Sequence, residues 1–260
     1  MIGRRDEYEK MFRVEQQLWW YRSLHERVLA DIQRQFGARR DLKLLDAGCG
    51  TGGLLWFLHR RGYTNLHGVD GSSDAVALCR ERALSVDLVN LTQLATYRPD
   101  AVGYDVIVCN DVFCYFNDID LRALLGELAR RAGPGGLLIS NNNAFGVFRG
   151  QHDVAVGSTR RFVRSDFDWL MSAAGFTIRQ STYWSLALSP LILAVRQWQA
   201  LQLRLNPAAE TPDSDIDLPA PWLNETLYQI VRLEQKVLPR TPFGSSLFLS
   251  CHKSPNPNGD

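Results

Sequence analysis

Between residues 42 and 178, short apolar runs alternate with segments whose apolar positions recur at helical spacing. The predicted strands are Lys43–Asp46, Leu66–Asp70, Asp87–Leu91, Tyr104–Asn110, Gly136–Asn141 and Phe176–Tyr183, with a further strand at Leu247–His252. The predicted helices between them are Gly52–Arg61, Asp74–Ala83, Asp120–Arg131 and Ser165–Ala174. Short apolar strands that alternate with amphipathic helices are typical of a parallel sheet covered on both faces. The pattern therefore predicts an α/β fold with a doubly wound, mostly parallel sheet.

Helical segments flank this core on both sides. The segment from Arg5 to Phe36 is predicted to be helical and to end at Gly37. Two later helices, Ser189–Leu205 and Leu223–Leu238, are separated by an irregular linker rich in Pro, Asp and Ala. The predicted organisation is an N-terminal helical lid (1–40), a core (41–183 and 244–253), a helical insertion that covers the substrate side (184–243), and a disordered tail (254–260).

Composition narrows the class of protein. The chain has 260 residues, 45% of them hydrophobic and 22% charged, which is ordinary for a soluble globular protein. A net charge of +1 produces no strong positive field that would attract nucleic acid to the protein. Five cysteines without a C-x-x-C pair predict neither a metal site nor a redox motif.

The charged N-terminus lacks an apolar stretch behind it, so no signal peptide and a cytoplasmic location are expected. The segment Trp184–Val195 is too short to span a bilayer. We expect this segment to pack in the protein core. Contact with an apolar substrate and peripheral contact with a membrane surface are the alternatives.

The most informative stretch is a strand that breaks into a glycine loop, Leu44–Gly53, and enters a helix. Glycines let the backbone approach a ligand closely. Gly48, Gly50 and Gly53 fit the dinucleotide pattern G-x-G-x-x-G. Asp46 argues against that pattern, because its carboxylate would repel a pyrophosphate but would suit a ligand that carries an ammonium and a sulfonium.

This stretch resembles motif I of the class I S-adenosylmethionine (SAM) methyltransferases, in which D-x-G-x-G holds the methionine end of SAM. The resemblance implies a Rossmann-like sheet whose last strand is antiparallel, and SAM as cofactor. Asp70 ends the next strand, where an acid can accept hydrogen bonds from a ribose diol. In the family an acid near Thr92 binds adenine; here Thr92 and Gln93 are the candidates. The predicted cofactor residues are Asp46, Gly48, Gly50, Asp70, Gly71, Thr92, Gln93, Asn110, Asp111 and Trp20.

Further motifs resemble one bacterial class I subgroup, whose members are mostly predicted methyltransferases near polysaccharide or secondary-metabolite genes. These motifs are W-W-Y at Trp19–Tyr21, H-D at His152–Asp153, R-R-F at Arg160–Phe162 and P-F-G-x-S-L at Pro242–Leu247. The subgroup has His where this chain has Tyr115, V-P-A where it has Asn141–Ala144, and Tyr where it has Phe162. All three departures fall on the acceptor side.

Candidate catalytic residues follow the fifth strand and lie on the first helical segment. His152 is the first choice for a general base, and Asp153 is a candidate to orient it. The alternative is that this pair fixes the loop. Tyr21 and His25 share one helix face and could act on the acceptor, or could simply pack on the sheet.

The predicted substrate-binding residues are Tyr115, Asn142, Arg160 and Arg161. The two arginines could pair with a substrate carboxylate or phosphate, or with an acid of the lid. The sequence thus predicts a SAM-dependent methyltransferase for a small-molecule, glycan or natural-product acceptor, with an oxygen acceptor favoured. The alternatives are a SAM-binding cyclase or regulatory protein that does not methylate, and a nicotinamide oxidoreductase.

Overall fold

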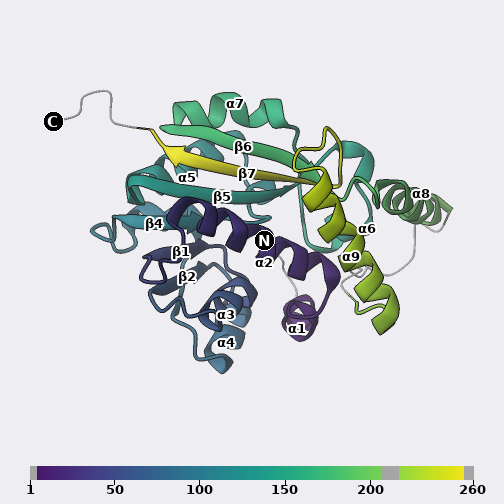
Figure 1. Ribbon diagram of the computed structural model, residues 1–260, viewed down its shortest axis with the longest axis horizontal. Helices are drawn as coiled ribbons and strands as arrows, with labels where there is room; N and C mark the ends of the chain where they lie inside the picture. The colour runs from purple at the N-terminus through teal and green to yellow at the C-terminus, as the bar shows by residue number, and fades with distance from the viewer. Residues whose placement is uncertain (1–4, 206–216, 255–260) are drawn as a thin grey trace.

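The computed structural model describes residues 5–205 and 217–254, and within them the strands form one seven-stranded sheet in the order β3-β2-β1-β4-β5-β7-β6. The strands are β1 (Leu44–Ala47), β2 (Leu66–Asp70), β3 (Val86–Leu88), β4 (Tyr104–Val108), β5 (Ala132–Asn143), β6 (Phe176–Trp184) and β7 (Ser246–Lys253). Only β7 runs antiparallel to its neighbours β5 and β6, which it separates. The predicted fold class is confirmed (Figure 1).

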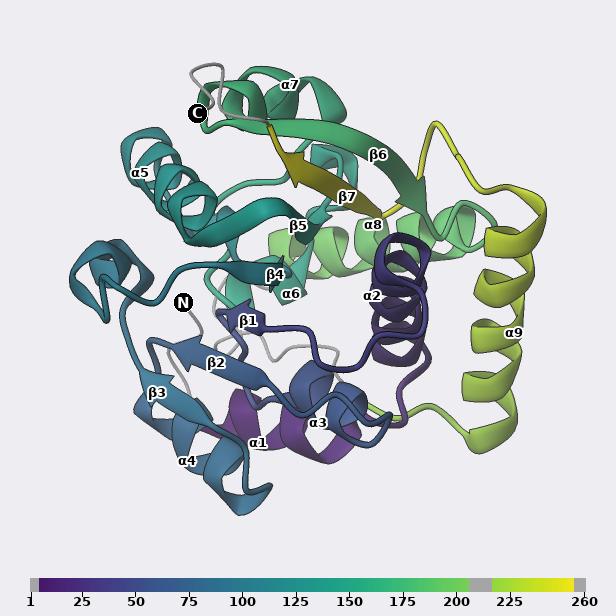
Figure 2. The same ribbon diagram turned by 60° about the vertical axis from the view of Figure 1, so that its left-hand side comes forward.

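Successive strand residues face opposite sides of the sheet, and each side has its own apolar core. Leu45 and Ile107 belong to the core beneath α5 (Asp118–Arg131) and α7 (Arg164–Ala173). Leu44 and Val106 belong to the core beneath α2 (Trp19–Phe36), α3 (Gly53–His59) and α4 (Ser73–Glu81). Burial on both faces explains why these strands are continuous apolar runs in the sequence. Figure 2 shows the two helical layers on either side of the strands.

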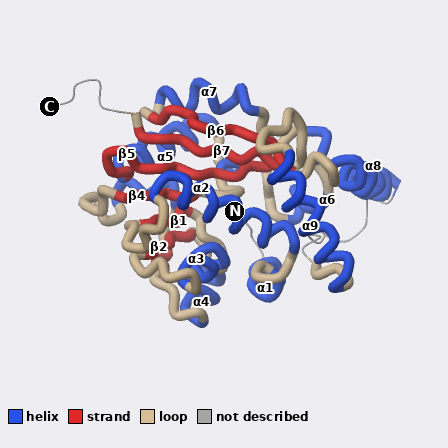
Figure 3. Tube along the Cα trace, viewed as in Figure 1, coloured by secondary structure: helices blue, strands red, loops and turns tan. Residues whose placement is uncertain are grey.

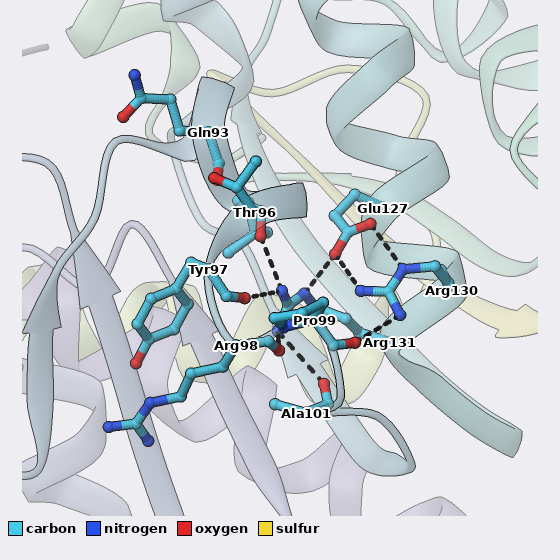
Figure 4. Close-up of polar contacts among 10 residues, drawn as sticks. Gln93, Thr96, Tyr97, Arg98, Pro99, Ala101, Glu127, Arg130 and Arg131 are labelled. Atoms are coloured by element: carbon cyan, nitrogen blue, oxygen red, sulfur yellow. Dashed lines mark hydrogen bonds and ion pairs between the residues drawn. The ribbon is translucent and has the colours of Figure 1, made fainter.

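The third predicted strand is shorter than expected. β3 ends at Leu88, and Leu91 begins a 3-10 helix, η1 (Leu91–Thr96), capped by the Asn90 side chain. The turn after η1 is held by Arg131, the last residue of α5, whose buried guanidinium donates to the carbonyl oxygens of Leu94 and Tyr97 (Figure 4). Glu127 accepts from the same guanidinium at 2.7 Å, so the buried charge is paired.

The N-terminal segment is two helices, where the sequence predicts one continuous segment. α1 (Arg5–Val14) and α2 are separated by the turn at residues 15–18. Asn224 of α9 (Pro221–Val237) stabilises this break, because its side chain accepts from the Trp19 amide and donates to the Gln17 carbonyl. Helical spacing alone cannot reveal a break that is fixed by a residue about 200 positions away.

The chain beyond the parallel strands closes one end of the sheet. η2 (Phe113–Tyr115), η3 (Gly146–Phe148), α6 (Gln151–Ala155), α8 (Ser189–Leu205) and α9 lie in the connections that follow β4, β5 and β6. Figure 1 shows α6, α8 and α9 gathered beyond the carboxyl ends of the parallel strands, and Figure 3 shows the helices in blue with the described loops near them in tan. The predicted tail, apart from Ser254, and the middle of the predicted linker lie outside the described residues.

Candidate active site

A cavity of about 500 Å³ lies at the carboxyl ends of β1 and β4, where open α/β sheets bind ligands. One part of its wall is formed by the glycine loop and polar strand ends. Another part is formed mainly by aromatic and aliphatic side chains of α2, α6, α8 and the segments around them, together with Arg161 and Arg196. The two parts differ enough in chemistry to be described separately.

The glycine loop follows β1 in a conformation that requires glycine. Gly48, Gly50 and Gly52 have φ values of +82°, +54° and +79°, which L-residues with a side chain adopt at a cost. A Cβ on Gly48 would overlap the Val112 side chain. The Gly48 amide donates to Val69 of β2, and the Gly50 amide donates to the Asp70 carboxylate at 2.9 Å. The loop is therefore held to β2 and presents its backbone to the cavity.

Three carboxyl groups line this polar part: Glu15, Asp46 and Asp111. Burial, reinforced by Asp70 and Glu15, raises the pKa of Asp46 to about 8. Burial also raises the pKa of Asp111 to about 7 and raises that of Glu15. Among the described residues, Lys and Arg form no ion pair with Asp46. This wall therefore favours a cation, because a positive ligand would stabilise the ionised carboxylates.

Asp111 has an unusual backbone. Its φ is +57°, a conformation that is rare outside glycine and concentrated at functional sites. The Asn141 side chain holds its carboxylate with bonds of 3.0 and 3.1 Å, and Trp184 Nε1 donates to the Asn141 oxygen at 2.9 Å. The end of β4 is thus fixed through β5 to the end of β6.

The segment between α1 and α2 is fastened over the glycine loop. Glu15 accepts from the Thr51 hydroxyl at 2.6 Å and forms a buried ion pair with Arg82, which directly follows α4. Arg82 also donates to the carbonyl oxygens of Thr51 and Phe12. Gln16 donates to the Gly53 carbonyl at 3.0 Å. These contacts make the first two helices part of the cavity wall.

The aromatic residues of α2 pack around one another at the cavity. Trp20 stacks on Trp184 with ring centroids 5.7 Å apart, and its edge meets Tyr21 at 5.0 Å. His25 lies between Tyr21 and Phe57, at 6.2 and 5.2 Å. Burial and the nearby Arg61 and Arg82 lower the pKa of His25 to about 3, so this imidazole stays neutral at physiological pH.

His152 of α6, Arg161 and Tyr115 also line the cavity, near Asp111. The charges of His152 and Arg161 lower the pKa of Asp111, against the larger effect of burial. Burial raises the pKa of Tyr115 well above its usual value, and Asp111 adds to that effect. An imidazole, a phenol and a carboxylate therefore line the same part of the cavity.

Comparison with known proteins agrees with this geometry. Residues 45–138, from β1 into β5, match the family described as a methyltransferase domain. A protein from Galdieria sulphuraria proposed to be a sarcosine dimethylglycine methyltransferase is similar in structure, with a TM-score of 0.58 and 14% identity over 89% of this chain and 85% of that one. Residues 45–138 thus match a methyltransferase domain, and the chain shares the fold of this solved structure.

Two further structures share the fold of this methyltransferase domain. Magnesium protoporphyrin IX methyltransferase from Synechocystis PCC 6803, solved with SAM, has a TM-score of 0.53 and 18% identity over 97% of this chain and 86% of that one. The (4+2)-cyclase SpnF has a TM-score of 0.55 and 16% identity over 89% and 81%. No curated protein matches the sequence. The methyltransferase domain confirms SAM as the family's cofactor, while these low identities show the fold alone.

Many residues predicted for the methyltransferase site do line the cavity. They are Trp20, Tyr21, His25, Asp46, Gly48, Gly50, Gly71, Asn110, Asp111, Tyr115, His152 and Arg161. Their roles stay predictions. The remaining six predicted residues are placed elsewhere by the structure, and each placement has a physical reason.

Asp153 faces away from the cavity. Its fully buried carboxylate forms two bonds to Arg161, at 2.9 and 3.0 Å, and accepts from the Gly150 amide. The expectation that Asp153 orients His152 is therefore corrected: it holds Arg161 and the start of α6. Arg160 is also turned away and pairs with Asp118 at 2.5 Å.

The predicted adenine contacts lie two positions too late in the sequence. Thr92 and Gln93 are exposed, and the Thr92 hydroxyl donates to Asn90. Asn90 and Leu91 line the cavity in their place, because η1 begins immediately after Asn90 and turns the next two residues outward. The Asp70 carboxylate accepts from the Gly50 and Ser72 amides, so it shapes the loop, and its contact with ribose stays a prediction.

Asn142 lies on the other face of β5 from the site. Its side chain donates to the Ser140 hydroxyl, whereas Asn143 lines the cavity. The alternation of side chains along a strand accounts for this one-residue difference. The sequence analysis also missed Glu15 and Tyr8, which lie in α1 or just after it, and the Asn141–Trp184 bond. The apolar residues near Glu15 in the sequence were the signal that could have indicated its burial.

Finally, none of the helices in the described parts of the chain is both long and apolar enough to cross a membrane.

Proposed function

We propose that this chain is a SAM-dependent methyltransferase that methylates a hydroxyl group of a small molecule. The observation that carries the proposal is a single cavity with two chemically different walls. One wall holds Asp46, Glu15 and the glycine loop, and the other holds His152 and Tyr115 beside apolar side chains. The first suits a cationic methyl donor, and the second suits a hydroxyl acceptor with an apolar body.

Bound SAM supplies a methyl group on a sulfonium. In this proposal Asp46 binds a positive group of SAM, and the backbone of Gly48 and Gly50 lies against its methionine end. Gly71 and Asn90 line the adjoining wall, where the nucleoside would lie. Nicotinamide dinucleotides are disfavoured, since a pyrophosphate would meet carboxylates on this wall and, among the residues that the structure describes, no basic side chain.

His152 is the proposed general base. It would accept the proton of the acceptor hydroxyl, and Asp111 would stabilise the imidazolium that results. Proton removal by a positioned base contributes about 10²–10⁴-fold to such reactions. Tyr21 and Tyr115 would close the space around the acceptor, and alignment of acceptor and donor supplies the rest of the acceleration.

The test uses SAM with a labelled methyl group and a small-molecule extract of the host. Wild type is expected to transfer label to an extract component, and His152→Asn is expected to lose about 10²-fold or more of that activity while binding SAM normally. His59→Asn, on the exposed end of α3, is the matched control. Unchanged turnover in the His152 variant would remove this residue from the mechanism.

A second candidate keeps SAM binding without methyl transfer. It is favoured by the similarity to the cyclase SpnF and by the apolar character of the acceptor wall. Label would then remain on SAM in every extract, although calorimetry would still detect SAM binding.

We further propose that residues 1–40 act as a lid and residues 184–243 as a cover of the acceptor side. The contacts of Glu15 and Gln16 with the glycine loop support the first, and the cavity-lining residues of α8 and α9 support the second. The cytoplasmic location and a biosynthetic role stay predictions from the sequence.

A further inference from the structure

We infer that the acceptor is an amphiphile: a hydroxyl-bearing molecule whose apolar tail leaves the cavity along α8. The inference deepens the proposed function and rests on it. It rests on one face of α8, which lines the cavity at one end and is exposed on the protein surface at the other.

Four apolar residues of α8 and the turn before it line the cavity: Leu188, Leu191, Ile192 and Val195. They recur at spacings of three and four, which places them on one side of the helix. Leu188 is buried, whereas Leu191 and Val195 are 57% and 43% exposed. Leu191 and Val195 are therefore at the mouth of the cavity, in contact with both its interior and solvent.

The apolar face continues beyond the mouth. Trp198 is 62% exposed and lies one turn after Val195 on the same side, and Leu201 follows it. Large apolar side chains that form a continuous exposed stripe mark binding surfaces more often than single exposed ones do. Because this stripe begins inside the cavity, it would bind the part of the acceptor that the cavity does not enclose.

The inner end of the cavity determines the other half of the molecule. His152 and Tyr115 line this end together with Asp111, and Phe148 and Val156 line the cavity nearby, where η3 and α6 contact α8. Arg161 also lines this end, but its charge is neutralised by two bonds to the buried Asp153. An uncharged hydroxyl therefore fits this end better than a carboxylate or phosphate would.

Linear alcohols from butanol to decanol are suitable probes, because they carry a hydroxyl and vary only in tail length. Calorimetry on the full chain should show affinity rising about fourfold per added methylene, the value expected for apolar burial. An absence of binding, or an affinity that does not change with chain length, would overturn the inference.

The mouth can be tested with a matched pair of variants. Val195→Glu places a charge in the stripe and is expected to weaken decanol binding at least tenfold with little effect on butanol. Leu233→Glu, on α9 at 62% exposure and outside the cavity lining, should leave both affinities unchanged. Both positions are exposed, so thermal unfolding should be similar in the two variants; equal decanol binding by both would contradict the assignment of the tail to α8.

SAM binding measured on the same samples separates this inference from the proposed function. If SAM binds and the alcohols do not, the methyltransferase proposal stands and the amphiphile is excluded; if SAM also fails to bind, both fall. Sedimentation with phosphatidylcholine vesicles distinguishes the source of the tail. Binding that Val195→Glu abolishes assigns an amphiphile held in a bilayer, and no sedimentation assigns one that is free in solution.

Discussion

The Asn141 side chain donates to both carboxylate oxygens of Asp111, at 3.0 and 3.1 Å, and so fixes a residue of unusual backbone conformation at the centre of the site. The amide orientation is unambiguous, because Trp184 Nε1 can only donate and its partner is the Asn141 oxygen. The bond favours the ionised carboxylate and opposes the effect of burial on the pKa of Asp111. Asn141 thus tunes Asp111 from outside the cavity lining.

Replacement of Asn141 by leucine should therefore change both stability and titration. Asn141→Leu leaves the buried Asp111 carboxylate and Trp184 Nε1 without this partner, which is expected to lower the free energy of unfolding by roughly 1–3 kcal/mol in denaturant titration. The pKa of Asp111 should rise above about 7, so the pH profile of SAM binding should move to higher pH.

Trp184→Phe is the control for Asn141. It removes the indole donor but leaves the bonds to Asp111, so it should lower stability without moving the pH profile. A profile that stays in place in Asn141→Leu would show that the amide does not control the ionisation of Asp111.

Asp46 should affect stability and ligand binding in opposite directions. Its pKa is raised from 3.8 to about 8, so between these values the folded protein holds a proton that the unfolded chain has lost. The free energy of unfolding should therefore fall as pH rises from about 4 to about 8. Asp46→Asn removes this dependence and should stabilise the protein at pH 8, while SAM affinity falls about tenfold or more with the loss of a buried ionic contact.

Thermal unfolding at pH 5 to 8.5, with and without SAM, checks the direction of both effects, on stability and on SAM binding. Wild type should also release protons on binding SAM near pH 7, which calorimetry in buffers of different ionisation enthalpy detects. Asp168→Asn, an exposed carboxylate on α7, should leave the pH dependence as in wild type. Wild-type stability that rises through this pH range would contradict the assignment.

The sequence is sufficient to predict the sheet and the wall that is proposed to bind SAM, because both depend on residues that are close together in the chain. Apolar runs locate the strands, and the spacing of Asp46, Gly48 and Gly50 identifies the loop. The carboxyl ends of parallel strands meet at one edge, so Asn110 and Asp111 could be placed there as well.

The wall that is proposed to bind the acceptor could not be predicted in the same detail, since it depends on contacts between residues that are distant in the sequence. Whether Asp153 faces the cavity or Arg161 depends on the path of the chain between two residues that are eight positions apart. Whether Asn142 or Asn143 points inward depends on a one-residue register in β5. The break between α1 and α2 depends on Asn224, in a helix that lies beyond the linker.

Arg82 should control how firmly the N-terminal helices cover the site. Arg82→Ala leaves Glu15 buried without its cation and removes the bonds to the Phe12 and Thr51 carbonyls. Breaking a buried pair costs about 3–5 kcal/mol, so α1 is expected to be docked less firmly. Hydrogen exchange should therefore accelerate in residues 5–18 and SAM should bind more weakly.

The exposed Arg80 on the same helix supplies the control. Arg80→Ala should leave both exchange and SAM affinity unchanged. Should Arg82→Ala show faster exchange throughout the sheet as well, the pair would stabilise the whole fold and would not act as a local latch.

Gly48 should tolerate substitution less well than a glycine of similar conformation elsewhere. Gly48 and Gly62 have φ values of +82° and +86°, so alanine at either position carries a strain of about 1–2 kcal/mol. A Cβ at Gly62 would meet nothing within 4 Å, whereas at Gly48 it would overlap Val112. The additional overpacking in Gly48→Ala is expected to cost about 1–3 kcal/mol more in denaturant titration. Val112→Ala in the Gly48→Ala background should recover part of that difference, because it removes the overlapping methyls; equal losses in the two single variants would mean that the loop shifts to accept the side chain, and SAM affinity would then show whether the shifted loop still binds.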